Sequence, residues 1–143
     1  MTAKEFLRRA RDANRRAEKA LERLDRLRAK LEAGRMSSAS GMPRGGSADW
    51  TETADRLIEL ERSTSAQVRE LVRWKEAALT AIRAVPDPRQ AEVLELYYIG
   101  GLTWEQVARQ MHTTSRWVMI LHGRGLQRVR VPEEVETDAK ENS

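Results

Sequence analysis

Arginine side chains recur at short intervals near the carboxyl end of this chain, and their chemistry is that of phosphate binding. Arg124 and Arg128 are four residues apart, a spacing that places both on one face of a helix. Arg109 and Arg116 lie nearby in the sequence. A guanidinium group binds phosphate through paired N–H donors, so we expect Arg109, Arg124 and Arg128 to contact a nucleic-acid backbone. A solvated basic face is the alternative.

Two short helices are predicted around these arginines. Thr103 is a good N-cap with Gln106 three residues later, as in a capping box, and it opens the helix TWEQVARQM. A turn follows at residues 112–114, with His112 at the position where many such turns have glycine. Ser115 is suited to cap the second helix. This pattern predicts a helix-turn-helix, which places its second helix in the major groove of DNA.

The second of these helices has an inward and an outward side. Val118, Leu121 and Leu126 are its inward apolar residues. Besides the backbone-binding arginines, we expect these residues to lie at the DNA: Thr114, Ser115, Arg116, Trp117, Met119 and Ile120. Met119 and Ile120 could contact thymine methyl groups, and Trp117 could contact sugars or base edges. For these three residues, packing against the N-terminal helices or a partner remains an alternative.

The same residues carry a resemblance to a known family. The segment LTWEQVARQMHTTSRWVMILHGRGLQRV resembles sigma-70 region 4, the domain of bacterial sigma factors that binds promoter −35 elements. The preceding DPRQAEVLELYYIGGLTW resembles the helix before the helix-turn-helix in that family. Over residues 4–130, the chain is similar to phage and prophage proteins of Gram-positive bacteria and to ArpU/RinA-type late-transcription regulators. The resemblance implies two partners, double-stranded DNA and a bacterial RNA polymerase bound through residues 94–101.

One departure limits what the resemblance implies. Sigma factors present mostly charged and amide side chains to the groove, whereas this chain has Ser115, Arg116, Trp117, Met119 and Ile120 there. The resemblance therefore implies the fold and the docking mode, but not the −35 element as the target.

Two heptad patterns precede this segment and predict two long helices. Apolar or small residues recur in alternating steps of 4 and 3 from Phe6 to Leu31. The same steps recur from Trp50 to Val85, in a helix expected over residues 49–85. Glu61 and Lys75 lie on this second stripe and could fix its register or its choice of partner.

A segment rich in glycine and serine, residues 34–48, separates the two heptad patterns. Gly34 is placed as a C-cap, and Ser47 or Asp49 as the next N-cap. The fold class expected is all-α, with a long coiled-coil-like hairpin over residues 1–85 and a small helix-turn-helix domain over 86–131. The long helices could equally pair with a second chain as a homodimer.

Composition and charge narrow the function further. The net charge is +4, and 34% of residues are charged but only 5% aromatic, which is typical of extended helices. Residues 101–131 hold five basic and one acidic side chain, which suits a polyanion partner. Residues 132–143 hold five acidic and one basic side chain and are expected to be a disordered acidic tail.

The sequence contains no pattern typical of metal binding, catalysis or membrane insertion. His112 and His122 stand without cysteine or a carboxylate cluster, so we expect no metal site and no cofactor. No P-loop, nucleophile elbow or zinc motif is present, so we expect no enzyme. Residues 1–31 contain no uninterrupted apolar run, so we expect neither a signal peptide nor a membrane span, and a location in the cytoplasm of a bacterial host cell.

These observations favour a sequence-specific DNA-binding transcription regulator of phage or prophage type that acts with bacterial RNA polymerase. A small terminase subunit for DNA packaging is one alternative, and a helical adaptor that binds no DNA is another. Gly123 and Gly125 lie inside the second helix of the motif, where each costs about 1 kcal/mol relative to alanine. Close helix packing or an approach of the backbone to phosphate should offset that cost.

Overall fold

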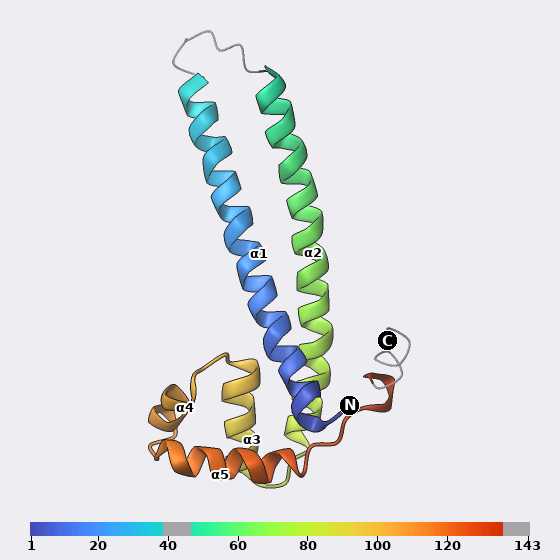
Figure 1. The fold of residues 1–143 in the computed structure, drawn as a ribbon, viewed down its shortest axis with the longest axis vertical. Coiled ribbons are helices and arrows are strands. Elements are labelled where there is room, and N and C mark those ends of the chain that lie inside the picture. Colours follow the sequence, from blue (N-terminus) through green and yellow to red (C-terminus); the bar gives the residue numbers. More distant parts are fainter. Residues whose placement is uncertain (39–46, 136–143) are drawn as a thin grey trace. The chain divides into compact units, whose positions relative to one another are not determined.

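The structure, a computed structural model, describes residues 1–38 and 47–135 (Figure 1). All regular elements in that part of the chain are helices, which confirms the expected all-α fold. Their bounds are α1 Ala3–Ser38, α2 Ser47–Arg83, α3 Pro88–Leu94, the π-helical turn η1 Glu95–Ile99, α4 Trp104–Gln110 and α5 Ser115–Leu126. Within the same residues, no helix is long and apolar enough to cross a membrane.

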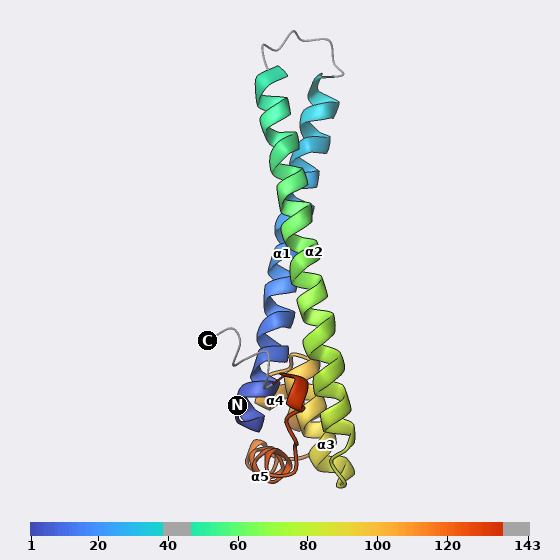
Figure 2. The same ribbon diagram turned by 90° about the vertical axis from the view of Figure 1, so that its right-hand side faces the viewer.

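The helices form two units, and the long helices contribute to both. Unit 1 consists of Met1–Asn14 together with Leu71–Ser143, and unit 2 consists of Arg15–Glu70. In unit 2 the α1 and α2 portions lie side by side and antiparallel (Figures 1 and 2). The two heptad helices therefore pair within one chain in this unit.

Small side chains line the contact between the helices of unit 2. Ala17 and Ala20 are buried, as the heptad pattern predicts, and Leu24 is buried at the next position. Thr64 of α2 is buried at 3% exposure. Arg28 donates from Nη2 to Glu61 Oε1 at 3.2 Å, so Glu61 pairs across the two helices. Both partners are about half exposed, so this pair contributes at most about 1 kcal/mol.

The ends of the long helices differ from the expected ones. α1 continues through Gly34 to Ser38, so the expected C-cap at Gly34 is wrong. A single glycine costs about 1 kcal/mol inside a helix, a penalty that the favourable residues on either side outweigh. α2 begins at Ser47 and ends at Arg83 rather than spanning 49–85. Residues 39–46 of the expected linker lie outside the described residues.

The apolar stripe of α2 also differs from the expected one. Trp50 is 52% exposed, although the heptad pattern places it on the stripe. Lys75 is exposed, and its neighbour Trp74 is buried with its ring 6.3 Å from that of Phe6. Burying an indole removes much apolar surface from water, whereas burying an ammonium group costs free energy. The stripe therefore passes through Trp74.

Unit 1 contains two clusters of buried residues. The first joins the start of α1 to the end of α2 and to the carboxyl-terminal segment, and its largest members are Phe6, Leu7, Trp74, Ile82, Leu94 and Tyr98. The second is the core of the small helical domain and consists of Val93, Val107, Ala108, Met111, Val118 and Leu121. Val93 and Leu94 are adjacent in α3, so this helix belongs to both clusters.

The residues after α5 also pack into unit 1. Val129 and Val135 are buried in the first cluster, and Val131 packs against it. The expected acidic tail starts at residue 132, but Val135 is only 6% exposed because it buries its side chain in this core. Residues 136–143 of the expected tail lie outside the described residues.

Candidate nucleic-acid interface

Local hydrogen bonds define both ends of the turn between α4 and α5. The Thr103 N–H donates to Gln106 Oε1 at 2.9 Å, and the Gln106 N–H donates to Thr103 Oγ1 at 3.2 Å. The predicted capping box is therefore confirmed. His112 has a φ of 54°, the left-handed conformation that the turn requires at this position.

The N-cap of α5 is one residue earlier than expected. Thr114 is extended, with φ −89° and ψ 154°, and its Oγ1 accepts a hydrogen bond from the Trp117 N–H at 3.1 Å. The expected cap at Ser115 is wrong, because Ser115 is already the first residue of the helix. Only a residue with extended backbone brings its side chain back over the free N–H groups of the first turn.

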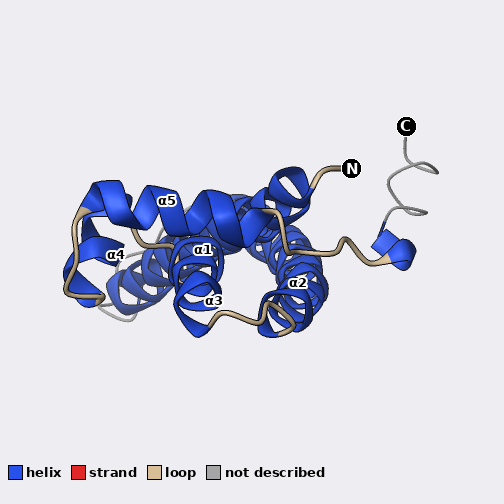
Figure 3. Cartoon of the chain, turned by 90° about the horizontal axis from the view of Figure 1, so that it is seen from below, coloured by secondary structure: helices blue, strands red, loops and turns tan. Residues whose placement is uncertain are grey.

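α5 packs against both α3 and α4 (Figure 3). Val118 and Leu121 are buried in the core of the small domain, as predicted. Leu126 is only partly buried and packs against the other cluster, while Gly125 faces α3. A Cβ at Gly125 would lie 3.1 Å from Leu94 Cδ1, so close helix packing explains this glycine.

A buried pair that the sequence pattern did not reveal links α5 to η1. Tyr98 Oη lies 2.7 Å from His122 Nε2, and both side chains are buried. Burial, with a smaller effect of the Lys4 ammonium, lowers the pKa of His122 from 6.5 to about 4. Burial likewise raises the pKa of Tyr98 to about 12, so both groups are neutral at pH 7. No cluster of metal-ligating side chains occurs among the described residues.

A contact from α1 holds η1 and the loop that follows it. Arg11 donates from Nη1 to the carbonyl oxygens of Tyr97 and, at 3.2 Å, Leu102. Its guanidinium carbon lies 3.9 Å from the centroid of the Tyr97 ring, and that ring stacks on Trp104 with centroids 3.7 Å apart. Arg11 lies outside the heptad stripe, so nothing in the pattern of α1 marks it for this role.

The outer face of α5 is open within unit 1. Trp117 is 37% exposed and Met119 is 45% exposed. Arg124 lies over the Trp117 ring, 5.6 Å from its centroid. Ile120 is partly buried. The other residues predicted to lie at the DNA are exposed: Arg109, Thr114, Ser115, Arg116, Arg124 and Arg128. The structure thus brings most of the set together along one helix, with Arg109 at the end of α4 and Arg128 just past α5.

Gly123 lies on this open face and has no packing partner among the described residues. An added Cβ there would meet nothing within 4 Å, in contrast to Gly125. Packing in the described structure therefore does not explain Gly123, whereas a close approach by a ligand to the helix would.

The comparison with known families agrees with this geometry. Residues 87–131 match the family Sigma-70, region 4. These residues therefore form a small helix-turn-helix domain similar to sigma-70 region 4, preceded by long helices that the match does not cover. Comparisons with curated proteins and with solved structures give no match.

Proposed function

We propose that this chain is a sequence-specific DNA-binding transcription regulator that inserts α5 into the major groove of duplex DNA. The observation that carries the proposal is the exposed outer face of α5, whose inner face is buried against α3 and α4 in the part of the chain that matches Sigma-70, region 4. Ser115, Arg116 and Trp117 lie in the first turn of α5, the part of a recognition helix that contacts base edges.

Dimensions support this docking. α5 has 12 residues and is therefore about 18 Å long, whereas the major groove is about 12 Å wide. With its first turn in the groove, the last turn of the helix lies at the groove's edge, beside the phosphates. Met119 and Ile120 would then contact thymine methyl groups, and Arg109, Arg124 and Arg128 would bind phosphates, with Thr114 fixing the start of the helix.

Selection from a pool of random duplexes tests the proposal directly. We expect the full chain to enrich one sequence class and to bind it about 10³-fold or more tightly than unrelated duplexes. Affinity should fall steeply between about 50 and about 200 mM salt, because the binding of phosphates by the protein releases counterions from the DNA. A chain that enriches no sequence and binds no duplex at low salt would refute the proposal and favour an adaptor.

We further propose that the regulator is of phage or prophage type and acts with bacterial RNA polymerase in the cytoplasm of the host cell. The match to Sigma-70, region 4 supports this partner. The expected contact through residues 94–101 is limited, because Leu94 and Tyr98 are buried and Arg11 covers Tyr97. The exposed parts of that surface are Glu95, Gly100 and Gly101. Transcription with purified bacterial polymerase, with and without the chain, tests this proposal.

The long helices are proposed to pair also with a second copy of the chain. Unit 2 exposes large apolar side chains, with Leu21 at 45%, Trp50 at 52% and Ile58 at 55% exposure. Mass measurement in solution distinguishes the assemblies. A dimer fits a regulator, whereas a closed ring of many subunits would favour a small terminase subunit.

A further inference from the structure

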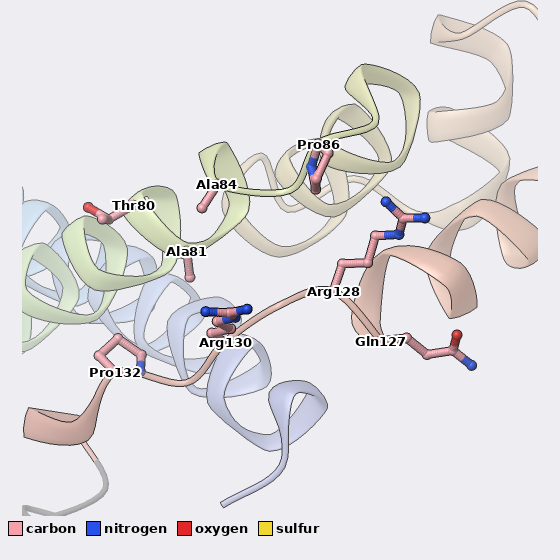
Figure 4. Close-up of a pocket in the computed structure, with 8 residues that line it drawn as sticks. All are labelled: Thr80, Ala81, Ala84, Pro86, Gln127, Arg128, Arg130 and Pro132. Atoms are coloured by element: carbon pink, nitrogen blue, oxygen red, sulfur yellow. The ribbon is translucent and has the colours of Figure 1, made fainter.

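A groove in unit 1 lies between the end of α2 and the segment that follows α5, residues 127–132 (Figure 4). Its volume is about 630 Å³. One wall is formed by α2 and the turn after it, with Ala81, Ala84 and Pro86. The opposite wall carries Arg128 and Arg130, and Figure 4 shows Arg128 extending toward Pro86.

The local backbone explains why both arginines line the same groove. Arg128 lies in the turn that closes α5, where its N–H donates to the Gly125 carbonyl oxygen at 3.0 Å, and residues 129–132 follow without regular structure. Val129 is buried in the core and Val131 packs against it. Because these two valines face the core, Arg128 and Arg130 on either side of Val129 are left exposed, and both line the groove.

The groove has an excess of positive charge. No acidic side chain lines it among the described residues. Within that same part of the chain, neither the Arg128 nor the Arg130 guanidinium has an ion-pair or hydrogen-bond partner. Two guanidinium groups without a partner among the described residues suit an anion with several acceptor oxygens, and a phosphate is such an anion.

The position of this protein groove relative to α5 indicates that the phosphate belongs to a DNA backbone. Arg128 and Arg130 lie two and four residues beyond the end of α5 at Leu126. A recognition helix about 18 Å long extends past the DNA major groove, which is about 12 Å wide. Residues directly after the helix therefore lie at the sugar–phosphate backbone of the DNA.

We propose that the groove between α2 and residues 127–132 is a second phosphate-binding site, in which Arg130, together with Arg128, holds the DNA backbone beside the major groove occupied by α5. This inference rests on the proposed DNA binding. It adds Arg130 and the end of α2 to the interface. The site contacts no base, so it strengthens binding to every sequence alike and does not change sequence preference.

Arg130→Ala in the full chain is the test, and Arg62→Ala is the matched control. Arg62 is an exposed arginine of unit 2 that pairs with Glu59, so the control removes the same charge. We expect Arg130→Ala to weaken duplex binding roughly tenfold at about 0.1 M salt, and to lower the slope of log affinity against log salt by about 0.9. Preference among sequences and the unfolding temperature should stay as in the unaltered chain.

Three results would overturn the inference. Equal affinities and salt slopes for Arg130→Ala and Arg62→Ala would show that the groove binds no phosphate. A lower unfolding temperature with an unchanged salt slope would show that Arg130 only stabilises the end of α2. Tighter DNA binding by Arg130→Ala, matched by a chain carrying Glu136→Gln, Asp138→Asn and Glu141→Gln, would identify the acidic carboxyl-terminal residues as the occupant.

The same assay separates this inference from the proposed function. If Arg116→Ala changes sequence preference while Arg130→Ala has no effect, α5 contacts the bases and only the groove assignment fails. If the unaltered chain binds no duplex at any salt concentration, both proposals fail together.

Discussion

The Tyr98 hydroxyl lies 2.7 Å from His122 Nε2, in a buried contact that joins η1 to the middle of α5. Tyr97, its neighbour, stacks on Trp104 of α4, and the His122 ring lies edge-on to Trp104 with centroids 4.7 Å apart. A single aromatic cluster thus connects the helix proposed to contact DNA with both helical segments that precede it. Burial lowers the pKa of His122 to about 4 and so keeps this ring neutral at pH 7.

Stability should therefore fall in mild acid. The pKa of His122 is lowered to about 4 in the folded chain, so between pH 4 and 6.5 the unfolded chain binds a proton that the folded chain does not. This contribution to stability is complete above about pH 6.5 and is lost as the pH falls toward 4.

We expect the free energy of unfolding to be roughly 1–2 kcal/mol lower at pH 5 than at pH 7. Denaturant unfolding at both pH values measures this difference. His122→Gln, which does not titrate in this range, serves as the comparison. An equal loss of stability in His122→Gln would show that other groups cause the pH dependence.

Gly123 and Gly125 should respond in opposite ways to alanine. A Cβ at Gly125 would lie 3.1 Å from Cδ1 of the fully buried Leu94, so Gly125→Ala should destabilise the chain by about 1 kcal/mol or more. Gly123→Ala meets no neighbour and should stabilise the helix by about 0.5–1 kcal/mol.

Gly123→Ala should have opposite effects on stability and on DNA binding. If the DNA approaches α5 closely at Gly123, Gly123→Ala raises the unfolding temperature and weakens DNA binding. Thermal unfolding and duplex binding on the same preparations measure both effects. A Gly123→Ala chain with a higher unfolding temperature and an unaltered affinity for DNA would show that the DNA does not approach α5 closely at Gly123.

Arg11→Ala should destabilise unit 1 by about 1–3 kcal/mol, because it leaves two partly buried carbonyl oxygens without their donor. It also removes the guanidinium from the Tyr97 ring. Arg8→Ala removes an exposed arginine one turn earlier and is the control. Denaturant unfolding compares the two, and similar stabilities would mean that the Arg11 contacts contribute little.

Arg116 and Arg124 should differ in what they contribute to DNA binding. Arg124 is four residues before Arg128 near the end of α5, so Arg124→Ala should weaken binding to all sequences about equally, by roughly tenfold. Arg116 is in the first turn, and Arg116→Ala should change the preferred sequence, at a cost of about 1–3 kcal/mol on the preferred site. Binding to a panel of single-base variants checks both, and unaltered binding by both variants would exclude this face of α5.

The local features of the helix-turn-helix follow from the sequence itself. The capping box of Thr103 and Gln106, the positive φ of His112 and the inward positions of Val118 and Leu121 all agree with the pattern. Each of these depends on residues no more than four positions apart. Backbone geometry and helical periodicity relate such residues in the same way in any fold.

Contacts between distant parts of the chain were decided only by the tertiary structure. Arg11 and Leu102 are 91 residues apart, and Tyr98 and His122 are 24 apart. Nothing local distinguishes Arg11 from the other arginines of α1, and the regular heptad steps of α2 place Lys75 rather than Trp74 on its stripe. These choices depend on which surfaces meet and on how much apolar area each meeting removes from water, a quantity that exists only once the helices are packed.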